Sequence, residues 1–502
     1  MSPANRYFVL VFLITLLGFF LRLKMWPNQV TFGYEQARDA LAAQNIFSQK
    51  KLTLIGPTTE ITGLFHGPTY YYLIGPFYYL LGKNPAPVAL LHLLINITTI
   101  PLIFFIGRDL FNQRVGLIAS FIFAISYEVS SYSLWLSNPS PGLPFIILTY
   151  YLFYKSLRQN PKYLPLATFL FAISVQSDLI IVTQIIPLFL LYYFYRPQTL
   201  KLKILVSSAI TFSLALINYP LFEARHHFLM TRKFFEILIS QDSQPKTIFT
   251  YLSTFLNGFA QEFANVLFPV HGFFAGILML ILFFYLWRKI KSTKITQNPW
   301  FFLLIWLLST FPPFLISAAM TSSEFAFFGT NAPIALLAAV SINSLMEKKR
   351  IFLASSCLFI IFFANLRAWN NYFPNPQRKL FDAQRGVVLK DTLAAINYTY
   401  TESAGQPFFV NTLTVPLYIS PLWNYLYSWH GQEKFGYLPS QNPDTLMQFL
   451  IIEPGWGQTY EIFRQKTIDL LNQKTQLEEK KTFGFILVEK RSLLTNQLKP
   501  QE

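Results

Sequence analysis

The chain has 502 residues, of which 53% are hydrophobic, 18% aromatic and only 13% charged. Because soluble domains carry about 25% charged residues, this composition excludes a disordered chain, a coiled coil and an ordinary soluble enzyme, and it predicts a mainly α-helical, polytopic membrane protein. The net charge of +16 has two interpretations, a nucleic-acid-binding surface or basic loops on one side of a membrane.

Eleven apolar runs are candidate transmembrane helices. The first, 7–23, is long for a signal peptide and no small-residue cleavage site follows it, so we expect a retained helix that Arg22 and Lys24 close. A further apolar run, 70–81, is short and broken by Gly75 and Pro76, and is predicted to be interfacial or re-entrant. The other ten runs are 88–107, 115–134, 142–154, 163–175, 179–195, 204–221, 272–287, 300–318, 332–345 and 351–366.

The basic residues predict the orientation of these spans. With the N-terminus inside, six short inside segments hold 16 Lys and Arg residues and only two acidic residues. Short loops rich in Lys and Arg stay in the cytoplasm, so the charge is explained by a multi-pass protein of the cell (plasma) membrane with a cytoplasmic N-terminus, without nucleic acid. The same topology places four segments outside: 24–87, 135–141, about 222–271 and everything after 366.

The sequence divides into a transmembrane module, 1–366, and a segment of soluble composition, 367–502. We expect the second part to form a small extracytoplasmic α/β domain, with strands at 407–410, 449–452 and 483–488 and a helix at 460–471. Alternatively, its aromatic residues pack against the membrane surface, in particular Trp423, Tyr425, Tyr427 and Trp429.

The first outer loop, 24–87, holds the densest set of chemically useful residues. Glu35 and Asp39 stand four residues apart and share one helix face, with Arg38 beside them. Such a carboxylate pair can supply a general base toward a hydroxyl acceptor, or it can hold a divalent metal ion against a phosphate. The alternative is a solvated helix start in which Glu35 interacts with the helix dipole.

Further along the same loop come Glu60 and the turn His66-Gly67-Pro68, which leads into three consecutive tyrosines. A histidine at the membrane edge titrates near neutral pH and could therefore exchange a hydrogen bond with a phosphate. The alternative is a turn histidine beside an interfacial tyrosine belt. Both Glu60 and His66 are candidate substrate-binding residues.

The later outer segments add polar residues at the ends of spans. Asn138 could donate to a phosphate, and Gln176 and Asp178 lie between two apolar runs, where Asp178 could equally cap the following helix. No Gly-rich phosphate loop, Walker motif or Cys/His zinc cluster occurs, which disfavours nucleotide hydrolysis.

After the span that ends near residue 221, the chain continues with Glu223, Arg225 and Arg232. Arginine binds phosphate bidentately, so Arg225 or Arg232 is a candidate clamp for an anionic lipid donor. The alternative is a basic amphipathic helix that contacts anionic headgroups of membrane lipids.

Several segments resemble a known family. They read FGYEQARDA, GLFHGPTYYYLIGPFYYLLGK, GRDLFNQRVGLIASFIFAIS and FFGTNAPIALLAAVSI. The chain resembles the dolichyl-phosphate-mannose protein mannosyltransferase-like membrane glycosyltransferases, a family-39-like group of the GT-C superfamily that includes the bacterial aminoarabinose transferases. The resemblance implies a GT-C-type bundle of about 11 transmembrane helices followed by the small C-terminal α/β domain.

The resemblance also implies roles for the first loop. An acidic residue there serves as the catalytic base or binds metal, and Glu35 matches it, with Asp39 as the second candidate and His66 at the His-Gly-Pro turn. The family often has another acidic residue in the next short outer loop, whereas the loop 135–141 has none and offers only Asn138. A divalent metal ion is therefore a candidate cofactor, but the loop 135–141 supplies no second carboxylate to bind it.

The function that follows is an inverting glycosyltransferase. It would move a sugar from a polyprenyl-phosphate carrier to a hydroxyl of a lipid, glycan or protein acceptor at the outer face of the membrane, with a first-loop carboxylate as base. The alternatives are a transporter or flippase of lipid-linked sugars, and an oligosaccharide polymerase or ligase.

Overall fold

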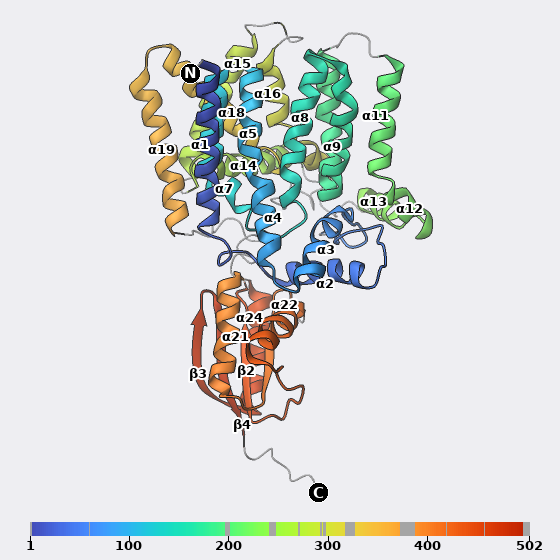
Figure 1. Ribbon diagram of the computed structural model, residues 1–502, viewed down its shortest axis with the longest axis vertical. Helices are drawn as coiled ribbons and strands as arrows, with labels where there is room; N and C mark the ends of the chain where they lie inside the picture. Colours follow the sequence, from blue (N-terminus) through green and yellow to red (C-terminus); the bar gives the residue numbers. More distant parts are fainter. Residues whose placement is uncertain are drawn as a thin grey trace.

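The computed structural model describes residues 3–59, 61–195, 201–239, 247–269, 272–291, 294, 298–316, 327–371, 387–417, 419–455 and 457–494. A bundle of helices forms one half of the molecule and a small α/β domain forms the other, with short helices packed between them (Figure 1). The N-terminus lies at the free end of the bundle, so the first loop and the α/β domain share the opposite end.

Each predicted apolar run contains a helix of the bundle. Among the described residues, three stretches are long and apolar enough to span a membrane, Asn5–Leu23, Ala86–Leu110 and Ile351–Asn370, and a pair bent by 54° adds a fourth if it is one span. The protein is thus an integral membrane protein, but the number of about 11 spans is not confirmed. The bundle helices are α1 (Pro3–Leu23), α4 (Ala86–Ile97), α5 (Thr99–Leu110), α6 (Gln113–Ile125), α8 (Leu143–Arg158), α9 (Leu164–Ser177), α10 (Ile185–Tyr195), α11 (Leu202–Ala215), α15 (Gly272–Lys291), α16 (Pro299–Leu307), α18 (Asn331–Glu347) and α19 (Ile351–Asn371).

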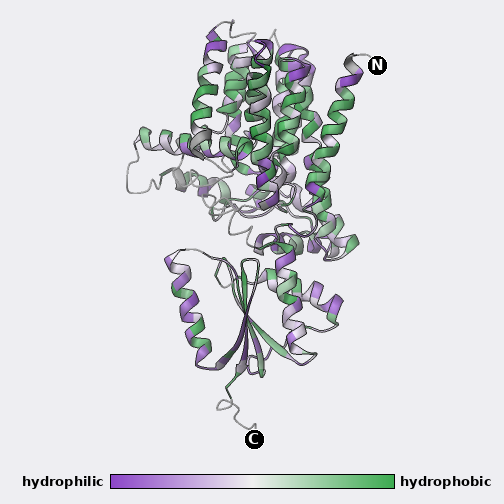
Figure 2. Ribbon diagram, turned by 90° about the vertical axis from the view of Figure 1, so that its left-hand side faces the viewer, coloured by the Kyte–Doolittle hydropathy of each residue, from purple (hydrophilic) through white to green (hydrophobic). Residues whose placement is uncertain are grey.

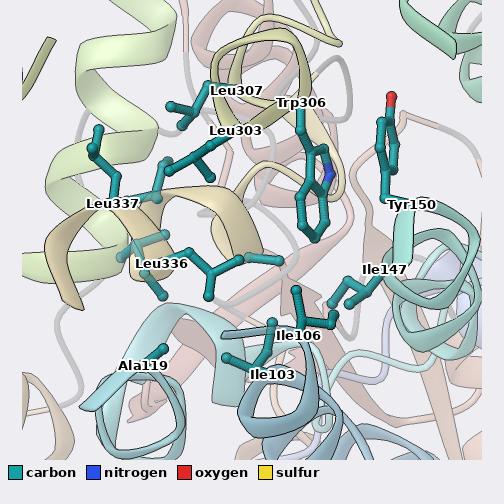
Figure 3. Packing of buried hydrophobic residues seen from close by; sticks show 14 of the residues in the cluster. Ile103, Ile106, Ala119, Ile147, Tyr150, Leu303, Trp306, Leu307, Leu336 and Leu337 are labelled. Carbon is teal, nitrogen blue, oxygen red and sulfur yellow. The ribbon is translucent and has the colours of Figure 1, made fainter. Parts of the chain in front are cut away.

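Aromatic and branched side chains fill the centre of the bundle. The rings of Tyr150 on α8 and Trp306 on α16 stack with centroids 4.9 Å apart, and Ile103 and Ile106 of α5 pack beside them (Figure 3). The outer faces of the bundle are also apolar (Figure 2). For example, Phe189 is 65% exposed. A helix surface that is apolar on both its inner and its outer side suits a lipid environment.

Helices α2 (Tyr34–Ser48) and α3 (Thr69–Leu81) of the first loop lie across the end of the bundle, with α13 (Leu229–Ile239) from the segment predicted as an outer loop (Figure 1). From the same segment, α14 (Ile248–Leu267) instead crosses within the bundle, where Phe255, Phe259 and Phe263 join its core. The predicted interfacial element 70–81 is thus α3. It packs so closely on α2 that a Cβ on Gly75 would lie 2.2 Å from the ring of Phe47.

The C-terminal domain is a mixed sheet covered on both faces (Figure 2). Its strand order is β1-β2-β4-β3, with β1 parallel to β2 and the other pairs antiparallel. The two predicted strands 407–410 and 449–452 correspond to β1 and β2, and the predicted helix to α24. The elements are α21 (Leu389–Ser403), β1 (Phe408–Leu413), α22 (Pro421–Leu426), β2 (Met447–Ile452), α24 (Gln458–Asn472), β3 (Thr475–Phe483) and β4 (Ile486–Leu493).

Two predictions for this domain were wrong. The run 483–488 is not one strand, because it contains the hairpin between β3 and β4, and the charged edge strand β3 carries no apolar alternation that could predict it. The alternative in which the four aromatic residues pack against the membrane surface is also wrong, because all four are buried within the protein. Trp423 and Tyr425 are each 1% exposed and belong to a core shared with α2 and α3.

Candidate active site

A short backbone ladder brings three distant segments together just before α2. The Thr31 amide donates to the carbonyl of Leu134 over 2.9 Å, and the Phe32 amide donates to that of Val387 over 3.0 Å. On the same side, the Leu389 amide donates to the carbonyl of Val30 over 2.8 Å. Residues 30–32 of the first outer loop therefore lie between the segment around Leu134 and the start of the C-terminal domain, and this ladder of backbone hydrogen bonds lies directly before α2.

Helix α2 carries the predicted carboxylates. The Gln36 side chain accepts a hydrogen bond of 2.8 Å from the Gly33 amide and so caps the helix. Oδ1 of Asp39 accepts from Nε of Arg38 over 2.8 Å and from the Tyr71 hydroxyl of α3 over 3.2 Å, and Asp39 is only 2% exposed. Glu35 is half-buried and accepts from the Tyr34 hydroxyl over 3.2 Å.

The electrostatic balance at Asp39 is unusual for a paired carboxylate. Burial raises the pKa of Asp39 to about 6, and the negative charge of Glu35 acts in the same direction. The Arg38 guanidinium and the Tyr71 hydroxyl lower that pKa, so they offset only part of the desolvation cost. Asp39 therefore ionises within the physiological pH range rather than far below it.

The same geometry bears on the candidate metal site. The Arg38 guanidinium lies against the Asp39 carboxylate and would repel a divalent cation there. In the described part of the chain, no group of three or more Asp, Glu, His or Cys side chains is arranged to hold a metal ion. The Glu35–Asp39 pair is thus arranged to bind the Arg38 guanidinium and does not fit a metal ion.

His66 lies in the turn before α3, next to the start of the 3₁₀ helix η3 (Leu179–Gln184). Its Nδ1 accepts a hydrogen bond of 3.2 Å from the Leu179 amide. Burial, assisted by the charge of Arg38, lowers the pKa of His66 to about 4. The ring is therefore neutral at pH 7 and can only donate through Nε2–H, which differs from the predicted titration near neutral pH.

Gln176, Asn138 and Asp178 meet around this turn. The Gln176 carbonyl accepts from the Gly67 amide over 2.9 Å, and its side-chain Nε2 donates to Oδ1 of Asn218 over 2.6 Å. Asn138 donates to the Ser177 carbonyl. Asp178 caps η3 by accepting from the Ile180 amide over 3.2 Å, in agreement with the capping alternative. The structure thus brings these three predicted residues together beside His66.

The predicted phosphate-binding arginines lie apart from this cluster. Glu223 of α12 (Asn218–Arg225) accepts from the amides of Met230 and Thr231 over 2.9 and 3.0 Å and thereby caps α13. Arg225 and Arg232 are exposed, and neither pairs with Asp39 or His66 among the described residues. Their helices pack on the first loop through Phe222, whose ring centroid lies 5.7 Å from that of Phe65. Glu60 lies outside the described residues.

A buried carboxylate stands in the run 115–134, where the sequence predicts one continuous span. Instead, α6 ends at Ile125 and a short helix, α7 (Tyr127–Ser131), begins after Ser126. Glu128 on α7 is 3% exposed. The loop after α6 therefore does contain an acidic residue. The signal was available, because a glutamate inside an apolar run marks a functional site more often than a lipid-facing position.

The chain is thus a helical membrane bundle with a carboxylate-bearing first loop and a small α/β domain at the same end (Figure 1). The family model for dolichyl-phosphate-mannose-protein mannosyltransferase matches residues 65–221, a range that begins just before His66. The resemblance to these membrane glycosyltransferases is therefore confirmed for that part of the chain. No curated protein sequence matches the chain.

Solved structures show the same fold over nearly the whole chain. ArnT from Cupriavidus metallidurans, bound to undecaprenyl phosphate, superposes with a TM-score of 0.58 at 10% identity over 99% of this chain and 100% of that one. Its apo state gives a TM-score of 0.54 at 11% identity over 97% and 98%. The oligosaccharyltransferase of Archaeoglobus fulgidus aligns less closely, with a TM-score of 0.47 at 13% identity over 87% and 64%.

Proposed function

We propose that this protein is an inverting glycosyltransferase that moves a sugar from a polyprenyl-phosphate carrier to the hydroxyl of a lipid, glycan or protein acceptor. The observation that supports this most strongly is the set Glu35, Arg38, Asp39 and Tyr71 on two first-loop helices, within a fold shared with a structure that holds undecaprenyl phosphate. A carrier of this kind leaves as a phosphate, so the reaction needs a base and a cationic anchor and no nucleotide.

The two carboxylates divide the work according to their exposure. Asp39 is buried and holds the Arg38 guanidinium, so it orients this cation. Glu35 is half-buried on the same helix face and is the better placed of the two to reach an acceptor. In the proposed step the acceptor oxygen attacks the anomeric carbon, its proton passes to Glu35, and the bond from that carbon to the carrier phosphate breaks.

Side chains that donate hydrogen bonds or carry positive charge would stabilise the departing phosphate of the carrier. His66 contributes a neutral Nε2–H, which lies in the turn that Gln176, Asn138 and Asp178 support. Arg225 and Arg232 would hold the carrier phosphate as it approaches along the membrane edge, with Glu223 fixing the fold of their helices. Glu60 remains a candidate for acceptor binding, and Glu128 is a second carboxylate that we add to the site.

The proposed orientation places the N-terminus in the cytoplasm and the C-terminal domain outside the plasma membrane. The basic inside segments support this, because their charge follows the positive-inside rule. A periplasmic-type or extracellular reporter fused after residue 494 should be active, and the same reporter fused before residue 3 should not. The reverse pattern would contradict the proposed orientation.

The test of the function is carrier release by the purified full-length protein supplied with polyprenyl-phosphate sugars. Glu35→Gln should abolish release while it preserves the fold. Glu461→Gln, an exposed glutamate of α24 paired with Arg464, is the matched control and should leave release unchanged. Full activity in Glu35→Gln would remove this residue as the base. Transbilayer movement of an unaltered donor would favour the transporter alternative instead.

A further inference from the structure

One side chain of the C-terminal domain contacts both ends of the α2–α3 unit. The ring of Tyr425 on α22 packs on Phe32, which precedes α2, with centroids 5.3 Å apart. Its hydroxyl donates to the carbonyl of Lys83, which follows α3. Lys83 also donates from Nζ to the Ser428 hydroxyl over 2.9 Å. Tyr425 is 1% exposed, so it lies inside the interface between the domain and the first loop.

Helix α22 is itself fixed to the sheet of the C-terminal domain. The indole Nε1 of Trp423 donates to Oε1 of Glu453 at the end of β2 over 2.8 Å. The other carboxylate oxygen of Glu453 accepts from the Val415 amide over 2.8 Å, just after β1. Glu453 thereby joins α22, which carries Tyr425, to the ends of two neighbouring strands.

Helix α2 depends on such support. A helix of 15 residues is marginal on its own in water, so its position is set by tertiary packing. Its buried face consists of small side chains, Ala37, Ala40 and Ala43, against which α3 and α22 pack in one shared core. Asp39 is buried as well, whereas Glu35 and Arg38 are half-buried, and all three stand on this helix, so any movement of α2 moves the proposed base and its cation together.

We infer that the C-terminal domain positions the carboxylates of α2, and that Tyr425 is a positioning residue through which it does so. This inference rests on the proposed function of Glu35. The domain then contributes to the geometry of the active site. Its Val387 carbonyl accepts a hydrogen bond from the Phe32 amide, and its Tyr425 contacts the residues that flank the α2–α3 unit at both ends. A displacement of about 1 Å at a reacting group can lower a rate about a hundredfold.

The chain offers a closely matched control in Tyr400 of α21. Tyr400 is buried in the same domain, at 3% exposed, and its hydroxyl also donates to a backbone carbonyl, that of Tyr437, over 2.6 Å. The ring of Tyr400 contacts Phe408, Phe435 and other residues of the same domain. Truncation of Tyr400 should therefore destabilise the domain without moving α2.

The experiment compares Tyr425→Phe, Tyr425→Ala, Tyr400→Phe and Tyr400→Ala in the full-length protein. We expect kcat to fall about tenfold or more in Tyr425→Ala with KM for the donor nearly unchanged, and Tyr425→Phe, which keeps the ring on Phe32, to recover most of it. Both Tyr400 variants should keep wild-type kcat below their melting temperature. Equal kcat in Tyr425→Ala and Tyr400→Ala would overturn the inference.

Hydrogen–deuterium exchange gives a second measurement that does not need activity. The amides of 34–48 should exchange faster in Tyr425→Ala than in the wild type, and not in Tyr400→Ala. If Tyr425→Ala does not fold, Tyr425→Leu, which removes both the ring on Phe32 and the hydroxyl, takes its place, and protection of 34–48 equal to the wild type in that variant would count against the inference. Should Glu35→Gln stay active, the proposed role of Glu35 fails, while the exchange data still report whether Tyr425 positions α2.

Discussion

Nε of Arg38 lies 2.8 Å from Oδ1 of Asp39, although the two residues are consecutive in α2. Consecutive residues of a helix point to different faces, so the Arg38 side chain folds back across the helix, where its guanidinium also lies 5.9 Å from the centre of the Tyr34 ring. The pair is a buried carboxylate with a half-exposed cation. That arrangement keeps positive charge at the surface of the site while the compensating negative charge stays inside.

The first prediction concerns the pH dependence of activity. The pKa of Asp39 is raised from 3.8 to about 6, so the stability that this group contributes is present below pH 3.8 and is lost as the pH rises through 6. Activity should instead increase as the pH rises through 6, because only ionised Asp39 forms the ion pair with Arg38. We expect carrier release to rise as the pH passes about 6, measured as the pH profile of kcat/KM.

Two variants test whether Asp39 causes this pH dependence. Arg38 and Tyr71 both lower the pKa of Asp39. Tyr71→Phe should therefore move the acid limb of the profile to higher pH, and Arg38→Gln should move it further in any activity that survives. Tyr72→Phe is the control, since its neighbouring hydroxyl donates to the Thr53 carbonyl. An acid limb that stays in place in Tyr71→Phe would assign it to another group.

The second prediction concerns the turn beside His66. A Cβ on Gly67 would lie 1.5 Å from Oε1 of Gln176, so Gly67→Ala must displace one of the two segments. Overpacking of a buried site typically costs about 1–3 kcal/mol. We expect Gly67→Ala to lower the melting temperature and to raise KM for the polyprenyl-phosphate sugar. The double variant with Gln176→Ala should partly restore both values. Gly276→Ala on α15 has open space around it and should be neutral.

The third prediction distinguishes the structural role of Glu223, which caps α13, from the proposed phosphate binding by Arg225 and Arg232. Arg225→Ala should raise KM for the polyprenyl-phosphate donor by about fivefold with little change in kcat, since an exposed ion pair contributes about 1 kcal/mol or less. The effect should weaken as salt is added. Glu223→Ala should lower stability through loss of the α13 cap. A KM that is unchanged in both Arg225→Ala and Arg232→Ala would exclude these arginines from donor binding.

The sequence was sufficient to find α2 and its carboxylates, because an i, i+4 pair beside a membrane span is a local pattern. It was also sufficient to find a helix in every apolar run. The end of α6 at Ile125 differs from the single span predicted over 115–134, although the residues after it turn polar, with Ser126, Glu128, Ser130, Ser131 and Ser133. Tyr127, Val129 and Tyr132 alternate with these polar residues, and a window of average hydropathy therefore extends over Glu128.

The interface of the C-terminal domain was beyond a local pattern. Trp423 and Tyr425 look like membrane-surface aromatics, and nothing near them in the sequence indicates that α2, some 390 residues earlier, covers them. Their partners are set by tertiary packing, in which the small side chains of Ala37 and Ala40 leave space for α22. Long-range complementarity of this kind does not appear in the hydropathy or spacing of one segment.

The last prediction concerns Arg22, which the sequence places at the end of the first span. It is fully buried, and its guanidinium donates to the carbonyls of Gly18 and Ala124 over 3.0 Å and to Oδ1 of Asn96 over 2.8 Å. Asn96 in turn donates to the carbonyl of Val129 over 3.2 Å. Arg22 and Asn96 thus satisfy carbonyls around the break between α6 and α7, next to Glu128.

Arg22→Met should leave Oδ1 of Asn96 and the carbonyl of Ala124 without the Arg22 donor, at a cost of about 1–3 kcal/mol for each buried group that stays unpaired. We expect a large fall in the melting temperature of the detergent-solubilised protein, and a smaller fall in Arg22→Lys, which can restore one of the bonds. Arg6→Met, an exposed arginine on the same helix, is the control. In a double-mutant cycle, Arg22→Met and Asn96→Ala should be non-additive, because each removes the partner of the other. Additive effects would show that α1 and α4 hold the α6–α7 break independently.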